Sequence, residues 1–232
     1  MRIIKLLTFL NLLIIYTSCN GQIKPIGEEP LELANFDFNT KFTTLLPDKN
    51  KSKNYDGYYE VKSELIEVDT IKDDDFNGSE KPIRIEYREK GYSSGDTLAT
   101  FEDFDFNAIN LVTTLDGNIM VVNALIGEIS LKETHRFIKL LDRKFGKSKK
   151  TKGEFIKPFD IYTWEFKDRF IKYCVVGDDE SNTLKIVVDK ENNTIENGKR
   201  QPHLEAYIYL IKKEYADKVI GKMGTGDLIY CD

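Results

Sequence analysis

The sequence predicts an α+β domain. Hairpin-linked strands are expected to form a mainly antiparallel sheet, with one long helix packed on a face and a short helix near the C-terminus. Three observations support this class: short segments that alternate apolar and polar residues, an Asp116-Gly117 turn between two apolar runs, and one long stretch with helical periodicity. The repeated strand–helix–strand order of a parallel doubly wound fold does not occur in the sequence.

The strands are expected where the side-chain character changes with a period of two. The alternation is clearest in Pro82–Arg88, where isoleucine and tyrosine alternate with arginine and glutamate. Asp116-Gly117 lies between Leu111–Leu115 and Ile119–Leu125 and is the strongest short-range hairpin signal in the chain. The tetrapeptide Phe-Asp-Phe-Asn occurs at 36–39 and again at 104–107, and both copies resemble half-buried strands. The other expected strands are Tyr58–Ile71, Leu111–Leu115, Ile119–Leu125, Ile161–Phe166, Phe170–Val176, Thr183–Asp189 and Leu204–Ile211.

The long helix is expected directly after Ser130. Ser130 and Glu133 have the spacing of a capping box, in which each side chain bonds the other residue's backbone N–H. Apolar residues then recur at helical spacing as far as Phe145, and Gly146 has the residue type that commonly ends a helix. A second, short helix is expected at Glu214–Ile220.

The composition indicates a folded, acidic protein. Hydrophobic residues make up 41% of the chain and aromatic residues 12%, which is enough for a core and argues against a disordered chain. If an N-terminal signal carrying Arg2 and Lys5 is removed, 32 basic residues remain against 39 acidic ones, a net charge of −7. Nucleic-acid binding needs a positive surface, so a nucleic-acid partner is not expected.

The first residues resemble a secretory signal peptide. Arg2 and Lys5 precede an apolar run, Leu6–Tyr16, and polar residues begin after Cys19. A helix that spans a bilayer needs about 20 apolar residues, so this run is too short to span one. We therefore expect residues 1–18 to be removed as a signal peptide.

Tyr16-Thr17-Ser18-Cys19 resembles the lipobox of bacterial lipoproteins, although that family favours Leu, Val or Ile at the position of Tyr16. The resemblance implies that Cys19 receives a diacylglyceryl group, that cleavage occurs just before it, and that its new amine is acylated, for example by palmitate. The protein would then be held on a membrane of the cell envelope, the outer membrane rather than the inner, with its domain in the periplasm or at the cell surface. Two alternatives are an ordinary signal peptide with a soluble product and an uncleaved signal anchor.

Residues 19–34 are expected to be a lipid-anchored tether. They contain two prolines, two glycines and several charged residues, a composition typical of linkers. The folded domain is then expected to span residues 35–232 as a single α+β unit.

Two cysteines remain once Cys19 is assigned to lipid. Cys174 and Cys231 would lie in a compartment that permits a disulfide. Alternatively, Cys174 is a buried packing residue in an apolar run and Cys231 an unpaired thiol near the C-terminus. The sequence does not give their separation, which decides between the two possibilities.

A possible nucleophile is Ser93. Gly91-Tyr92-Ser93-Ser94-Gly95 matches the G-x-S-x-G turn of α/β-hydrolases, and His135 and His203 are the only histidines that could activate the serine. The motif requires a helix after the turn, but the following residues alternate like a strand. A glycine- and serine-rich turn between two strands is the simpler interpretation.

A possible calcium site includes Asp73, Asp75 and Asn77, whose spacing matches the first oxygen ligands of a calcium-binding loop. Arg84 stands at the twelfth position, where such a loop needs glutamate, so an acidic turn is the default interpretation. Neither histidine has a second metal-ligand residue at a typical spacing. No cofactor is therefore expected.

Six basic residues occur close together after the long helix. Cations are favourable at a helix C-terminus and often form a solvated loop. Alternatively, they contact anionic lipid head groups or an acidic partner. These residues are Arg143, Lys144, Lys147, Lys149, Lys150 and Lys152.

The sequence therefore predicts where the protein is held better than what it does. The favoured hypothesis is a membrane-tethered, non-catalytic binding domain with a protein or glycan partner, a class that includes immunity and inhibitor proteins. The alternative is a small periplasmic serine hydrolase that uses Ser93.

Overall fold

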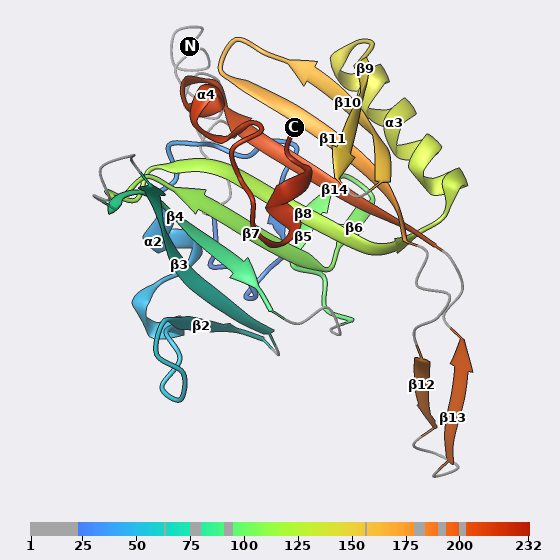
Figure 1. Ribbon diagram of the computed structural model, residues 1–232, viewed down its shortest axis with the longest axis horizontal. Helices are drawn as coiled ribbons and strands as arrows, with labels where there is room; N and C mark the ends of the chain where they lie inside the picture. Colours follow the sequence, from blue (N-terminus) through green and yellow to red (C-terminus); the bar gives the residue numbers. More distant parts are fainter. Residues whose placement is uncertain are drawn as a thin grey trace, which may run out of the picture.

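The computed structural model describes residues 23–62, 64–74, 80–90, 95–155, 157–178, 184–189, 194–199 and 203–232. Within these ranges the protein is mostly antiparallel β-sheet with a few helices, as the α+β class requires. Figure 1 shows a broad twisted sheet with helix α3 (Leu131–Phe145) and the C-terminal segment (residues 213–232) on different sides of it.

Nine strands of the described chain form the main sheet, in the order β2-β3-β4-β7-β8-β14-β11-β10-β9. All neighbouring pairs are antiparallel. The strands in this order are Tyr58–Val61, Glu64–Asp74, Glu80–Glu89, Ala108–Thr113, Ile119–Ile129, His203–Lys212, Arg169–Asp178, Lys157–Glu165 and Lys149–Phe155. The predicted strand Tyr58–Ile71 is instead two antiparallel strands, β2 and β3. The strands predicted at Pro82–Arg88, Ile161–Phe166, Phe170–Val176 and Leu204–Ile211 are confirmed in outline as β4, β10, β11 and β14.

The turn between β7 and β8 lies at the predicted Asp116-Gly117. Gly117 has a φ of +83°, a conformation that glycine adopts without the steric cost of a side chain. The Thr114 hydroxyl donates a hydrogen bond of 2.5 Å to Asp116, and it accepts one of 3.0 Å from the Asn118 backbone. The local sequence is therefore sufficient to fix this hairpin.

The predicted tether is wrong for the part of it that the structure describes, because residues 23–34 pack into the domain. Ile26 and Leu33 are each 1% exposed, and the Ile26 N–H donates to the Leu45 carbonyl at 2.9 Å. Strand β1 (Leu31–Glu32) pairs in parallel with β5 (Ala99–Phe101), which continues antiparallel to β6 (Phe104–Phe106). The apolar residues of this segment outweigh its prolines and glycines.

The two Phe-Asp-Phe-Asn copies have different structures. The second copy forms β6, as predicted, whereas the first is a turn. In the first copy the Asp37 carboxylate accepts the Asn39 N–H at 2.9 Å, a local bond that competes with strand pairing. The Phe36 and Phe38 rings are both buried and meet edge to face at 5.2 Å. A strand would also place both rings on one face, as β6 does with Phe104 and Phe106, so the shared alternation does not separate the turn from the strand.

Helix α3 (Leu131–Phe145) has the predicted bounds and both halves of the predicted capping box. It ends at Gly146, whose φ is +87°. Phe137 lies in the core, 4.9 Å from the Tyr173 ring of β11. The N-terminal segment and the small β1-β5-β6 sheet contribute to the same core cluster. Two shorter elements in that segment are helix α2 (Phe42–Leu45) and the turn η1 (Asp48–Asn50).

A second core cluster lies under the C-terminal segment. This segment contains η2 (Lys213–Tyr215), α4 (Ala216–Val219) and η3 (Gly226–Tyr230), so the predicted helix at Glu214–Ile220 is split into a 3-10 turn and one α-helical turn. Val219 and Leu228 are fully buried against the sheet. Strand β7 is consequently buried along its whole length, since each face is covered.

Between β11 and β14 the chain forms a separate antiparallel pair, β12 (Leu184–Asp189) and β13 (Thr194–Lys199). Figure 1 shows this pair away from the main sheet. Strand β12 matches a predicted strand, and β13 was not predicted. In the part of the chain that the structure describes, no helix is long and apolar enough to cross a bilayer.

Candidate functional site

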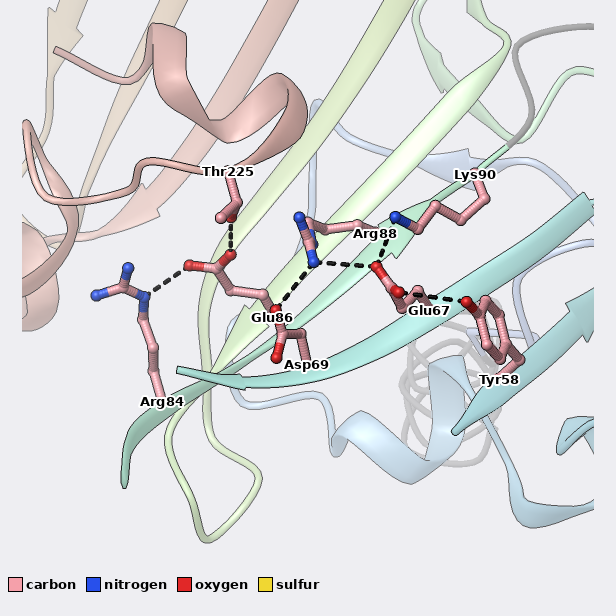
Figure 2. Close-up of polar contacts among 8 residues, drawn as sticks. All are labelled: Tyr58, Glu67, Asp69, Arg84, Glu86, Arg88, Lys90 and Thr225. Carbon is pink, nitrogen blue, oxygen red and sulfur yellow. Dashed lines mark hydrogen bonds and ion pairs between the residues drawn. The ribbon is translucent and has the colours of Figure 1, made fainter. Parts of the chain in front are cut away.

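Charged side chains gather on the face of β3 and β4 that meets the C-terminal segment. The alternation predicted for β4 is present, but this charged face is partly buried instead of fully solvated. Figure 2 shows Arg84, Glu86 and Arg88 of β4 with the residues that bond to them. We divide the region into a clamp, a charged ladder and a cleft.

The clamp is the set of hydrogen bonds that joins Arg84 and Glu86 of β4 to Lys222 and Thr225 of the C-terminal segment. Arg84 Nε donates to Glu86 Oε1 at 2.8 Å, and the two side chains are 5% and 0% exposed. Arg84 Nη2 donates to the Lys222 carbonyl at 2.9 Å, and the Thr225 hydroxyl donates to Glu86 Oε2. A buried ion pair needs such additional hydrogen bonds to offset the cost of leaving water. The segment around Lys222 and Thr225 supplies them.

The charged ladder consists of Tyr58, Glu67, Asp69, Arg88 and Lys90, which come from β2, β3, β4 and the residue after β4. Arg88 Nη2 lies 3.0 Å from both Glu67 Oε2 and Asp69 Oδ2. Lys90 Nζ lies 2.7 Å from Glu67, which also accepts the Tyr58 hydroxyl at 3.2 Å. The hydrogen bond from Lys90 lowers the pKa of Glu67. These contacts limit the side chains to few conformations.

A buried polar network continues behind the ladder, at the point where β4 and β7 stop pairing after Tyr87 and Leu111. The Ile109 N–H donates to Glu89 Oε2 at 3.0 Å, and the Glu89 N–H donates to Asn110 Oδ1 at 2.9 Å. The side chains of Glu89 and Asn110 thus take the place of backbone hydrogen bonds between β4 and β7.

This network reaches the C-terminal segment through two buried asparagines. Asn110 Nδ2 donates to Asn123 Oδ1 at 2.7 Å and to Asp227 Oδ2 at 3.2 Å. Burial, together with the nearby carboxyls of Glu64 and Asp227, raises the pKa of Glu89 to about 8. Glu89 is therefore protonated at neutral pH in the folded protein, as expected for a carboxyl that leaves water beside other acids.

The cleft has a volume of about 690 Å³ and lies between the ends of β3 and β4, the start of β8, and α4. Among the described residues its lining is mostly basic and apolar, with Asp73 as the one carboxylate. The lining residues are Ile71, Lys72, Asp73, Ile83, Arg84, Met120, Lys218 and Lys222.

Several predicted site residues lie outside the described residues. These are the lipidation residue Cys19, the possible nucleophile Ser93, and the possible calcium ligands Asp75 and Asn77. The lipidation, hydrolase and calcium predictions therefore stay predictions. The remaining candidate ligand, Asp73, shares its cleft with three lysines and an arginine, surroundings that favour an anion over a cation.

The two histidines lie near the start of α3, but they line two different open hollows on the surface. His135 lines a hollow of about 1120 Å³ along α3, and His203 lines one of about 830 Å³ beside the end of β8. Ser130, Leu131 and Glu133 contribute to both hollows. Among the described residues, no group of three histidine, cysteine or acidic side chains could hold a metal ion.

Cys174 and Cys231 both belong to the core cluster under the C-terminal segment, and both are buried, free thiols in this structure. Cys174 Sγ donates to the Tyr230 carbonyl at 3.3 Å. Burial raises the pKa of Cys174 well above its usual value, and the neighbouring Cys231 adds to this. The fold thus brings together two cysteines that are far apart in the sequence, and a disulfide between them stays a prediction.

The basic stretch after α3 is not a simple loop. Lys149, Lys150 and Lys152 lie in β9, the edge strand of the main sheet. Lys150 and Lys152 both pair with Asp160 of β10, at 2.9 and 2.5 Å.

The other members of the stretch lie at the end of α3 and just beyond it. Lys144 pairs with Glu102, and Arg143 and Lys147 are exposed. Lysines along an exposed edge hinder pairing with a second sheet, which gives the β9 lysines a structural role.

The sequence did not indicate the clamp or the buried network as a site. Arg84 and Glu86 were placed together on one face of a strand, but nothing nearby in the sequence shows that Thr225 covers them. Glu89 was one of 39 acidic residues with no distinguishing pattern. Only the long-range packing of the C-terminal segment separates these residues from ordinary surface charges.

No protein-family model, curated protein or solved structure matches this chain.

Proposed function

We propose that this chain is a membrane-tethered, non-catalytic binding domain of the bacterial cell envelope. It recognises a protein or glycan partner, in the manner of an immunity or inhibitor protein. The lipobox-like sequence that ends at Cys19 supports attachment to a membrane through lipid. The charged ladder on β3 and β4 supports the binding role.

The charged ladder is the observation that carries the binding role. The side chains of Asp69 and Lys90 are 44% and 45% exposed, whereas Arg88 between them is 14% exposed and holds two carboxylates. A surface whose side chains are already ordered loses little conformational entropy when a partner binds. Donors and acceptors alternate along it, which suits a polar protein surface or the hydroxyl groups of a glycan.

The lipid anchor at Cys19 is tested by Cys19→Ala in the full chain. Two or more acyl chains anchor a protein stably, so the wild type should fractionate with membranes. The Cys19→Ala variant should be soluble or accumulate as an uncleaved precursor. An unmodified mature N-terminus in the intact mass of the wild type would show that the lipid assignment is wrong.

The binding role is tested by crosslinking in intact cells followed by quantitative mass spectrometry. Asp69→Ala/Lys90→Ala removes the exposed ends of the ladder without changing net charge. Asp105→Ala/Lys139→Ala is the matched control, because both of its residues are also exposed. We expect one envelope component to crosslink to the wild type and the control but not to the ladder variant. Identical crosslinking by all three proteins would contradict the proposed surface.

A further inference from the structure

The cleft beside α4 concentrates positive charge in a protein that is acidic overall. Lys72 comes from β3, Arg84 from β4, and Lys218 and Lys222 from α4 and the turn after it. The whole chain has a net charge of −5. The cleft is therefore locally positive although the protein is acidic overall. The electrostatic field of these four basic side chains attracts an anion.

The acids near the cleft neutralise only part of this charge. Lys72 pairs with Glu80 at 2.6 Å and Arg84 with Glu86, while Asp73 lines the cleft itself. Lys218 and Lys222 form no ion pair with any residue that the structure describes. Four basic groups against the three carboxylates of Glu80, Glu86 and Asp73 leave a net charge of about +1 for a ligand, carried by the ammonium groups of Lys218 and Lys222.

Arg84 is a fixed part of the cleft. Its side chain is held by Glu86 and by the Lys222 carbonyl through Nε and Nη2. Within the described ranges, Nη1 is the guanidinium nitrogen that has no hydrogen bond to the protein. A buried, oriented donor of this kind binds an oxyanion with little loss of side-chain entropy.

The cleft also has an apolar side. Ile83 is 43% exposed although it lies in a strand of the main sheet, and Ile71 and Met120 lie beside it in the lining. An aliphatic side chain exposed next to several ammonium groups fits a ligand with two parts, an anionic group and an apolar body.

We propose that this cleft binds an organic phosphate, in which a phosphate joined to an apolar body contacts Lys218, Lys222 and Arg84 while the apolar body covers Ile83. A phosphate monoester carries close to two negative charges at neutral pH, and Lys218 and Lys222 have no ion pair among the described residues, so the cleft has a net positive lining for it. An anionic phosphate ester occurs both in a soluble organic phosphate and in the head group of an anionic phospholipid, where the phosphodiester carries one negative charge. The site is separate from the charged ladder and does not depend on the proposed partner.

The test is calorimetric titration of the full chain with phenyl phosphate, in nanodiscs of phosphatidylcholine or, if the chain carries no lipid, in buffer. Inorganic phosphate and benzyl alcohol each represent one half of the ligand. Phenyl phosphate should bind more tightly than either of them. Failure of the wild type to bind phenyl phosphate, or equal binding of inorganic phosphate, would overturn the proposal.

Lys218→Ala/Lys222→Ala should weaken phenyl phosphate binding about tenfold or more, which corresponds to about 1.4 kcal/mol. Lys53→Ala/Lys147→Ala has the same charge change on exposed residues elsewhere and should bind as the wild type does. Unfolding curves of both variants show whether the fold is kept. Equal affinities in the two variants would overturn the proposal.

Phosphatidylglycerol in the nanodisc distinguishes the two sources of phosphate. If it suppresses phenyl phosphate binding to the wild type but leaves the residual binding of Lys218→Ala/Lys222→Ala unchanged, the cleft takes a lipid head group. If binding is unchanged, the cleft takes a soluble organic phosphate. Both results support the site and differ only in the origin of its ligand.

Discussion

The Thr225 hydroxyl donates a hydrogen bond to the fully buried carboxylate of Glu86, and this contact joins residues that are 139 positions apart in the chain. Together with the bond from Arg84 to the Lys222 carbonyl, it ties the C-terminal segment to β4. Glu86 depends on this contact because a buried carboxylate that loses a donor keeps the cost of desolvation.

Replacing Thr225 with valine should therefore destabilise the protein. Valine keeps the shape but removes the donor to Glu86, and the expected loss is about 1–3 kcal/mol in the free energy of unfolding. Thr225→Ser keeps the hydroxyl and serves as the control. Urea unfolding followed by circular dichroism measures both variants, and equal stability of the two would show that the hydrogen bond contributes nothing.

This contact also marks the limit of what the sequence predicts. The Asp116-Gly117 turn and the Ser130–Glu133 capping box were predicted correctly because all their hydrogen bonds lie within a few residues. Both are properties of local backbone geometry. The pairing of Glu86 with Thr225 depends on how the last residues fold back over the sheet, which no local pattern encodes.

In the N-terminal segment, residues 23–34, the sequence predicted too little structure. Its prolines, glycines and charges predicted a tether, yet Ile26, Leu31 and Leu33 are buried. Composition describes the average behaviour of a segment, whereas three well-placed apolar residues decide whether it packs. The candidate site was only partly predictable for a related reason: the sequence placed Arg84, Glu86 and Arg88 on one face but did not show what covers that face.

Glu89 should make the protein less stable as the pH rises. Its pKa is about 8 in the folded protein, against 4.5 for an ordinary glutamate. The folded state therefore binds more protons than the unfolded state between these values. The stabilisation is complete below about pH 4.5 and is lost progressively as the pH rises toward 8.

Glu89→Gln tests this dependence, because the amide cannot ionise but can still accept the Ile109 N–H. The variant should be more stable than the wild type at pH 9 and similar to it at pH 5. Urea midpoints at pH 5, 7 and 9 provide the measurement. A variant with the wild-type pH profile would show that Glu89 is not the source of the dependence.

The lysines of β9 should keep the protein from associating through its sheet edge. Lys150 and Lys152 are exposed on the last strand of the main sheet, and charged side chains there hinder pairing with a second molecule. Lys150→Thr/Lys152→Thr should keep the fold but associate at high concentration in light scattering. Lys53→Thr/Lys147→Thr, which removes the same charge from exposed positions elsewhere, should stay monomeric. A monomeric edge variant would show that the lysines do not protect the edge.

Cys174 and Cys231 should be unreactive in the folded protein if they are reduced. Both thiols are buried, and burial raises the pKa of Cys231 to about 12 and that of Cys174 well above its usual value. The thiolate is the reactive form, so iodoacetamide at pH 8 should label neither residue before unfolding and both in urea.

The same labelling experiment tests the predicted disulfide. A bridge between Cys174 and Cys231 would prevent labelling in urea until a reductant is added, and it would lower the intact mass by two hydrogens. Cys231→Ser provides the control, because it leaves Cys174 as a single thiol that must label on unfolding in either case. Rapid labelling of the folded wild type would contradict the buried position of both residues, since the C-terminal segment would then have to leave the sheet.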